Sequence, residues 1–161
     1  MTIRPATAAD AAAICAIHNE GIVDRVATLD TDPRTLDTTL AWLSDRSPRH
    51  PVIVAETADG VVGWGSLNRF NARAAYDHVA DFSVYVARVR RGHGFGRQLL
   101  DRLVALAREH RFHKLVLSTL AVNRAAIALY ERCGFSHVGI YREQGLVDGR
   151  WVDVVIMERV L

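Results

Sequence analysis

The 161-residue sequence has only two cysteines, Cys15 and Cys133, and they lie far apart in the chain. Cys15 and His18 have a spacing that zinc ligands can adopt, but no second pair of ligands accompanies them. We therefore expect no bound metal. Both cysteines are expected to be small, buried apolar residues, which suits a protein of a reducing compartment.

The sequence also lacks a strong charge bias and a long hydrophobic run. Its formal net charge of +2 is too small for a dedicated nucleic-acid binder, so any basic site must be local. The alanine-rich start is interrupted by Arg4 and Asp10, and no apolar run reaches the ~18 residues needed to span a membrane. We expect a soluble, cytoplasmic protein that binds neither nucleic acid nor membranes.

Half of the residues are hydrophobic and 24% are charged, which is the composition of a folded globular protein. The chain has no repeat, low-complexity tract or linker, and its length suits one domain over residues 1–161. Hydrophobic periodicity, capping residues and turn residues predict a mixed sheet with helices on its faces. The expected strands are 2–6, 52–57, 61–67, 79–87, 114–120, 135–147 and 150–160.

Four helices are expected between these strands. The first follows a capping box at Thr7–Asp10 and ends near residue 20, before a loop over residues 21–31. Asp32 and Pro33 are expected as the N-cap and first residue of a helix that runs to about residue 45. The remaining two span 94–110 and 123–133, with Asn123 as a cap and Gly134 as a stop. Residues 71–77 are expected to form a loop or a short helix.

A basic, glycine-rich segment lies between the strand at 79–87 and the helix that follows it. The segment contains no P-loop pattern, G-x-x-x-x-G-K-[ST]. It also fails the G-x-G-x-x-G dinucleotide pattern, because Arg97 and Leu99 stand where a third glycine is required. It does contain Arg91-x-x-Gly94-x-Gly96 at the start of a helix. Glycines let a ligand approach the backbone, and a helix N-terminus offers free N–H groups. The segment therefore predicts a pyrophosphate site.

This arrangement resembles the GCN5-related N-acetyltransferase (GNAT) family, whose acetyl-CoA signature is [QR]-x-x-G-x-[GA]. A second family segment, N-x-x-A-x-x-L-Y-E-x-x-G-F, is matched by residues 123–135. The two signatures occur in the family's order, and the resemblance covers essentially the whole chain. It implies the GNAT fold, an α/β (α+β) fold whose mixed, mostly antiparallel central sheet is flanked by helices on both faces.

A closer resemblance is to the phosphinothricin acetyltransferase branch of this family. It is carried by IRPATAADAAAICAIHN, ATLDTDPRT, ARAAYD with ADFSVYV, and GLVDGRWVDV. Enzymes of that branch acetylate the α-amine of small, glutamate-like amino acids such as phosphinothricin, methionine sulfone, methionine sulfoximine and arsinothricin. The branch also implies a homodimer. Resistance and metabolism both remain open as the physiological purpose.

The resemblance places acetyl-CoA on the glycine-rich segment and along the preceding strand. The pantetheine arm would pair with the backbone of that strand as an added strand does, beside a slot opened by a bulge. Nucleic acid does not fit this segment, because no aromatic stacking platform accompanies it. The residues expected to contact the cofactor are Val84, Val86, Arg91, Gly92, His93, Gly94, Phe95, Gly96, Arg97 and Asn123.

Two residues are candidates for proton transfer. Asp81 would accept the proton of the acceptor amine, directly or through water, because an ammonium has no lone pair with which to attack a thioester. The branch typically has Glu at this position. Tyr130 would protonate the departing thiolate. The alternative interpretations are a strand residue that faces solvent or pairs with an arginine for Asp81, and a half-buried packing residue for Tyr130.

Arg73 is the main candidate for binding the substrate, since a guanidinium suits a carboxylate, phosphinate or arsinate. Tyr76, Thr28 and Arg142 are weaker candidates for the same site. Two alternatives to this function remain open. One is an acetyltransferase that acts on a protein N-terminus or a polyamine, and the other is a non-catalytic CoA-binding sensor.

Overall fold

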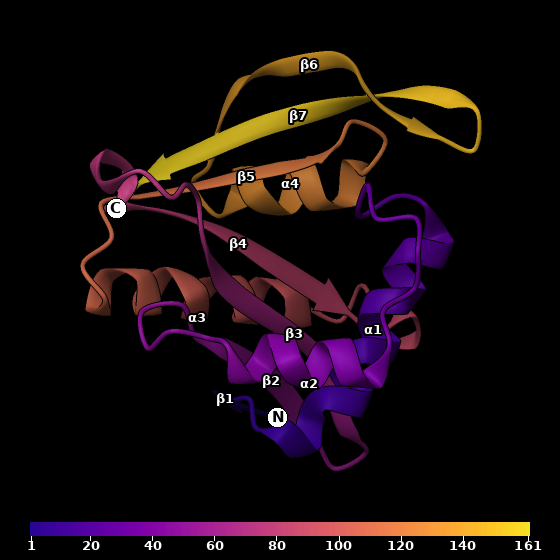
Figure 1. Cartoon of the computed structure of the whole chain (residues 1–161), viewed down its shortest axis with the longest axis vertical. Coiled ribbons are helices and arrows are strands. Elements are labelled where there is room, and N and C mark those ends of the chain that lie inside the picture. The colour runs from indigo at the N-terminus through magenta and orange to yellow at the C-terminus, as the bar shows by residue number, and fades with distance from the viewer.

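A seven-stranded sheet with helices on both faces forms the centre of the protein (Figure 1). The computed structural model describes all residues, 1–161. Its strands are β1 (Thr2–Pro5), β2 (Val52–Thr57), β3 (Gly60–Arg69), β4 (Val79–Val86), β5 (Lys114–Leu120), β6 (Ser136–Val147) and β7 (Arg150–Val160). Its α-helices are α1 (Ala11–Asp24), α2 (Leu36–Ser44), α3 (Phe95–Glu109) and α4 (Arg124–Arg132). Short 3-10 turns are η1 (Ala8–Asp10), η2 (Ala74–Tyr76) and η3 (Arg88–Arg90).

The strands lie in the order β1-β2-β3-β4-β5-β7-β6, and only the β4–β5 pair is parallel. The predicted fold class and order of elements are therefore confirmed. The parallel pair is short, because residues 79–81 of β4 pair with residues 114–116 of β5 and the strands then diverge. Figure 1 shows β4 and β5 parting toward their C-terminal ends. This split in the middle of the sheet leaves the far end of β4 with a partner on one side only.

The two faces of the sheet carry separate apolar clusters. Helix α3 packs on one face through Leu99, Leu100 and Leu103, which belong to the larger cluster of 19 buried residues. Helix α1 contributes Ile14 and Ile17 to a smaller cluster on the other face, together with Val52, Val54 and Trp64. Because side chains alternate along a strand, the side chain of Trp64 faces α1 while its glycine neighbours face α3.

Helix α1 is longer than the sequence predicts. It continues through Gly21 to Asp24, and Arg25 ends it with a left-handed backbone (φ 56°). Gly21 lies against the ring of Tyr85, where an added Cβ would be 3.0 Å from the ring carbon Cε1. The next residue, Ile22, is 2% exposed. Tertiary packing thus extends the helix past a residue that favours a stop.

Helix α2 begins at Leu36, so the predicted start at Asp32 and Pro33 is wrong. The cap is Thr35, whose hydroxyl accepts a hydrogen bond of 3.1 Å from the Thr38 N–H. Asn19 of α1 binds both backbone groups of Arg34, at 2.8 Å to its N–H and 2.9 Å to its carbonyl. This long-range clamp holds Arg34 outside the helix.

The remaining predictions of turns and caps agree with the structure, apart from the bulge. Asn123 caps α4 by accepting a bond of 3.3 Å from the Ala126 N–H, and Gly134 follows this helix with a φ of 80°. Asp148 and Gly149 turn the β6–β7 hairpin, both with positive φ. The predicted bulge in β4 is absent, because β4 keeps an unbroken register with β3. The slot arises from the divergence of β5 instead.

Candidate active site

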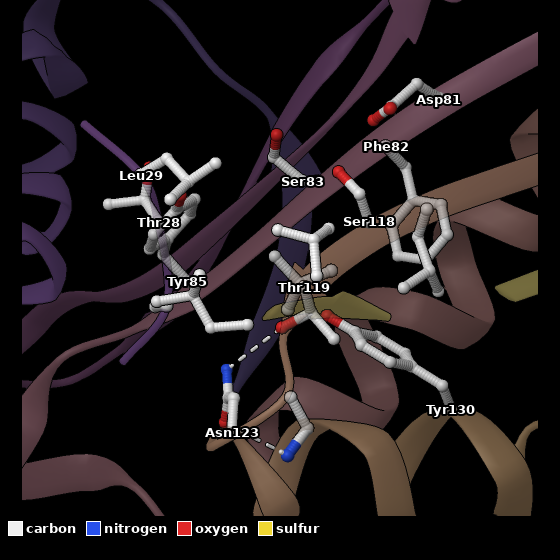
Figure 2. A pocket seen from close by; sticks show the side chains of 16 residues that line it. Thr28, Leu29, Asp81, Phe82, Ser83, Tyr85, Ser118, Thr119, Asn123 and Tyr130 are labelled. Carbon is white, nitrogen blue, oxygen red and sulfur yellow. Dashed lines mark hydrogen bonds between the residues drawn. The ribbon is translucent and has the colours of Figure 1, made fainter. Parts of the chain in front are cut away.

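A cavity of about 290 Å³ lies where β4 and β5 part (Figure 2). It brings together five of the residues predicted for the site, namely Thr28, Asp81, Val84, Asn123 and Tyr130. Its other lining residues are Ala27, Leu29, Phe82, Ser83, Tyr85, Leu117, Ser118, Thr119, Leu120, Ala126 and Val154. The cavity thus has walls from β4, β5, α4 and the loop after α1.

Asp81 is the last residue of β4 that pairs with β5, so its carboxyl lies at the point where these two strands part. The residue is half-buried, and burial raises the pKa of its carboxyl to about 6. Hydrogen bonds from the Asn68 side chain and the Phe82 backbone act in the opposite direction and lower that pKa. The group therefore ionises close to neutral pH, as a proton acceptor in an enzyme requires.

Tyr130 reaches the same cavity from α4. Its ring packs edge-on against Phe82, with 5.7 Å between centroids, and contacts Phe135. Figure 2 shows its hydroxyl pointing into the cavity, toward the side of Thr119. Burial raises the pKa of this phenol above its ordinary value, so it stays protonated at neutral pH. The side chain can donate a proton there.

The free edge of β4 faces the opening between the strands. Ala87 donates its N–H to Val62 of β3 at 2.9 Å, and backbone groups alternate in direction along a strand. Val84 and Val86 therefore direct their backbone groups toward the side that β5 has left, where the Val86 carbonyl accepts a bond of 3.1 Å from Arg91 Nε. Such an edge can pair with an extended ligand.

The glycine-rich segment has the form of an anion site. Gly92 and Gly94 adopt positive φ values of 79° and 83°, and a Cβ added to either would meet nothing within 4 Å. Gly94 caps the 15-residue helix α3 without a side-chain hydrogen bond. The first N–H groups of α3 are thus left for a ligand. These features fit a pyrophosphate group.

The arginines of this segment pair with carboxylates. Arg91 binds Asp24 at 2.5 Å, and Arg88 binds the same carboxylate at 2.6 Å. Hydrogen bonds led by the one from Arg88 hold the pKa of Asp24 below its ordinary value. Arg97 pairs with Asp101 at 2.9 Å. The segment is therefore anchored to the end of α1.

Three further predicted cofactor contacts, His93, Phe95 and Gly96, lie in the same segment. The ring nitrogen Nδ1 of His93 lies 2.9 Å from the Arg91 carbonyl, and the His93 ring stacks near Phe95. Gly96 faces Leu129 and Val86, to which an added Cβ would be 3.4 and 3.7 Å away. These residues join the segment to the open edge of β4.

A second cavity of about 460 Å³ adjoins the first and shares Thr28, Ser83 and Tyr85 with it. Three arginines and one carboxylate line it, so its charge favours an anionic group. Its remaining lining residues are His18, Asp30, Arg34, Trp42, Arg46, Trp64, Asn68 and Arg69. Burial is the main cause that lowers the pKa of His18, which favours the neutral ring.

Three of the predicted substrate residues line neither of these cavities. Arg73 is exposed at the start of η2, and Tyr76 in η2 packs edge-on against Phe70. Arg142 on β6 is 75% exposed and pairs with Asp153 at 2.9 Å. Thr28 alone of the four lines both cavities. The roles of the other three in substrate binding stay predictions.

Several cavity residues were not predicted from the sequence. Ser83 and Tyr85 share a strand face with Asp81, and their i, i+2, i+4 spacing could have revealed them. Arg34 and Arg46 come from the connections on either side of α2. No three His, Cys, Asp or Glu side chains gather as a metal site would need. None of the helices is both long and apolar enough to cross a membrane.

The comparison with known families agrees with this geometry. Residues 16–135 match the family described as Acetyltransferase (GNAT) family. The chain belongs to the GNAT family. The predicted family and N-acetyltransferase activity are therefore confirmed.

Two curated relatives cover almost the whole GNAT chain. The L-methionine sulfoximine/L-methionine sulfone acetyltransferase of Salmonella typhimurium is 35% identical, over 98% of this chain and 93% of the relative. The phosphinothricin N-acetyltransferase of Streptomyces viridochromogenes is 32% identical, over 98% of this chain and 86% of the relative. The resemblance to the phosphinothricin acetyltransferase branch is thereby confirmed.

Two solved structures superpose closely on this GNAT protein. The ribosomal-protein-alanine N-acetyltransferase of Brucella melitensis has a TM-score of 0.96 and 37% identity, covering 100% of both chains. The acetyltransferase yncA of Salmonella typhimurium, solved with its cofactor acetyl-CoA, has a TM-score of 0.96 and 33% identity. It covers 100% of this chain and 94% of yncA.

Proposed function

We propose that this GNAT enzyme acetylates the α-amine of a small, glutamate-like amino acid or analogue. The class includes phosphinothricin, methionine sulfone, methionine sulfoximine and arsinothricin. The observation that carries the proposal is the arginine-lined cavity that adjoins the Asp81 cavity. The names of the Salmonella and Streptomyces relatives support the same class.

Acetyl-CoA is the acetyl donor of this enzyme, and the residues around the split strands fit it. When bound, it supplies an acetyl group activated as a thioester. The backbone of residues 91–97 would hold the pyrophosphate, with Gly92 and Gly94 leaving room for it. The backbone of Val84 and Val86 would pair with the pantetheine arm, and Asn123 lines the same slot.

Asp81 takes the role of proton acceptor in the proposed reaction. The acceptor amine arrives largely as an ammonium at neutral pH and must lose a proton before it can attack. With a pKa of about 6, the Asp81 carboxyl is mostly ionised at pH 7 and can take that proton, directly or through water. Tyr130 stays protonated and provides a proton for the departing thiolate.

The charge of the second cavity favours an amino acid over a polyamine. Arg34, Arg46 and Arg69 outnumber the single carboxylate of Asp30 among its lining residues. A carboxylate is attracted to such a lining, whereas a polycation is repelled by it. Arg34 is the most available of the three, since its carboxylate partner lies 3.8 Å away and is shared with His18.

A second acceptor class has its own support. The Brucella structure, at 37% identity, is titled a ribosomal-protein-alanine N-acetyltransferase, so the N-terminus of a protein is the alternative acceptor. A protein acceptor also carries an α-amine, but the α-carboxylate of its first residue is part of a peptide bond and has no charge. The arginines of the second cavity would then have no carboxylate to bind.

We also propose that the enzyme acts as a homodimer. Strand β6 lies at the edge of the sheet, and the β6–β7 hairpin exposes large apolar side chains. These are Val138, Ile140, Tyr141, Leu146 and Trp151, each 45–63% exposed. An unpaired edge strand and exposed apolar side chains together suit a protein interface.

The experiment that tests the substrate is CoA release from acetyl-CoA across a panel of amines. Phosphinothricin, methionine sulfone, methionine sulfoximine and arsinothricin are compared with ordinary amino acids, spermidine and a short peptide that begins with alanine. We expect turnover on the glutamate-like analogues to exceed that on the peptide and spermidine by at least about tenfold in kcat/KM. Turnover confined to the peptide would contradict the proposed substrate. Binding of acetyl-CoA without turnover on any amine would favour a sensor.

A further inference from the structure

Four polar side chains form a compact group on the face of the sheet that meets α1 and α2. In the register of β3 and β4, Ser66 lies opposite Ser83 and Asn68 lies opposite Asp81. Residues two apart on a strand share a face, so all four project to the same side. Ser66 is fully buried. Buried polar groups of this kind are expected to be joined by hydrogen bonds.

Asn68 is the hub of this group. Its side-chain oxygen accepts a bond of 2.9 Å from the Ser66 hydroxyl and one of 3.2 Å from the Arg46 guanidinium. Its amide nitrogen donates to the Ser83 hydroxyl at 3.1 Å. Asn68 also lies directly opposite Asp81 across the two strands, and its side chain lowers the pKa of the Asp81 carboxyl. Every polar atom of the amide is therefore engaged.

The chemistry of the partners fixes which way the amide faces. A guanidinium can only donate, so the atom of Asn68 that meets Arg46 must be the oxygen. The NH₂ group is then the part of the amide that donates to Ser83. It is also the only part that can donate to the carboxylate of Asp81 on the opposite strand, because an anion can only accept. Arg46 is held in turn by bonds from its guanidinium to the carbonyls of His50 and Leu67.

We propose that Asn68 is a positioning residue for Asp81. The Asn68 amide holds the Asp81 carboxylate at the mouth of the cavity and favours its ionised form. This inference rests on the proposed function, in which Asp81 accepts the proton of the amine. A neutral donor suits the task, because it stabilises the carboxylate without the strong ion pair that a direct arginine contact would make. The carboxylate stays basic enough to take a proton.

The short side chain of Asp81 matches this arrangement. Directly opposed residues on antiparallel strands have Cβ atoms about 5 Å apart, which is within reach of an Asn–Asp hydrogen bond. A Glu carboxylate would extend one methylene farther toward the cavity, beyond the strand-to-strand contact. Asp81 and Asn68 thus form a matched pair.

Few other groups near Asp81 titrate between pH 5 and 8. Tyr85 on its own strand and Tyr130 on α4 both have pKa values raised by burial. From α1, His18 directs its Nε2 to Asp30 at 3.1 Å rather than to Asp81. On β5, Ser118 is the neighbour in the cavity and carries no charge. Arg46, between α2 and β2, acts through Asn68, and Arg69 at the end of β3 binds loop carbonyls.

The test is the pH dependence of kcat/KM, measured from pH 5 to 9 with acetyl-CoA and the best acceptor of the panel. The wild type should rise through a midpoint near pH 6. In Asn68→Ala the midpoint should move up by roughly one unit, which lowers the rate about fivefold at pH 6 and little above pH 8.

Asn68→Asp, which is nearly isosteric and keeps an acceptor for Arg46 and Ser66, should move the midpoint further because two carboxylates then face each other. The exposed Asn71→Ala serves as the control and should keep the wild-type midpoint.

The outcomes separate the two proposals. Asp81→Asn should abolish the rise in rate, and a variant that keeps the wild-type profile would refute Asp81 as the base. If Asp81→Asn is inactive while both Asn68 variants keep the wild-type midpoint, the base stands and the role of Asn68 is overturned. A uniform loss of rate at every pH in the Asn68 variants would equally overturn it, because that pattern reports a structural defect alone. Thermal unfolding of each variant establishes that it is folded.

Discussion

Burial acts in the same direction on Asp81 and Tyr130, yet it has opposite consequences for their chemistry. It raises the pKa of both groups. For the carboxyl, the rise brings ionisation close to neutral pH and makes the anion a stronger base. For the phenol, the rise moves ionisation away from neutral pH and keeps the proton in place. One partly dehydrated cavity thus provides both an acceptor and a donor of protons.

The role of Tyr130 is tested by Tyr130→Phe. We expect kcat to fall by about 100-fold, the range typical for removal of a general acid, while the affinity for acetyl-CoA stays unchanged. The phenyl ring should keep its packing on Phe82 and Phe135, so the free energy of unfolding should hardly change. Steady-state kinetics and acetyl-CoA titration measure the two effects. Tyr141→Phe, at a tyrosine that is 55% exposed on β6, is the matched control. An unchanged kcat in Tyr130→Phe would remove this residue from the chemistry.

The packing of α3 on β3 sets the position of the glycine-rich segment at the element scale. Strand β3 presents Gly63 and Gly65 to α3, where an added Cβ would be 3.1 Å from Leu99 and 2.9 Å from Leu103. The absence of side chains at these two positions lets the helix lie close to the sheet. The N-terminus of α3 is thereby fixed next to the free edge of β4.

Gly65→Ala should lower the free energy of unfolding by about 1–3 kcal/mol, because the new methyl group overlaps Leu103 and the Ser83 carbonyl. Chemical denaturation measures this change. Gly139→Ala on β6 is the control, since a Cβ there meets nothing within 4 Å and its φ is not in the left-handed region. The argument fails if the two substitutions have the same effect on stability.

Elements with strong local signals could be predicted from the sequence, and those held by distant contacts could not. Strand β5 has the predicted bounds because five of the seven residues of KLVLSTL are apolar or β-branched. The predicted start of α2 is wrong because Asn19, 15 residues before Arg34, holds the backbone of Arg34 outside the helix. The end of α1 was misplaced because contact with Tyr85 outweighs the low helix propensity of Gly21.

At the scale of the whole molecule, the same division applies to the active site. Asp81, Tyr130 and the glycine segment stand in motifs that sequence alone can reveal. The second cavity is different, because Arg34 and Arg46 reach it from the connections around α2, and Arg46 meets Asn68 only in the folded sheet. In the proposed function, α3, β4 and β5 build the donor side and α1 and α2 the acceptor side, so the proposed site depends on the joining of two layers.

The β6–β7 hairpin connects this site with the proposed dimer. Its tip touches the loop after α1, where Asp148 pairs with Arg25 at 3.3 Å. Gly145 lies so close to Leu29, a lining residue of the cavity, that an added Cβ would be 2.7 Å from the leucine. A partner that covers the hairpin would hold this loop in place.

The homodimer is tested by the mass of the protein in solution, measured by light scattering. We expect twice the mass of one chain for the wild type. Leu146 and Trp151 are directly paired across the hairpin and are 56% and 63% exposed, so replacing both with Ser should remove apolar contact area and yield monomers. Val89→Ser, at an apolar residue that is 80% exposed outside the hairpin, should leave the mass unchanged.

A wild type that stays monomeric at micromolar concentration would contradict the dimer. A dimer that survives the double substitution would place its interface elsewhere. The kinetics of the monomeric hairpin variant complete the test. If its KM for the acceptor rises while its KM for acetyl-CoA does not, a second copy positions the acceptor side of the cavity through the contact between Gly145 and Leu29.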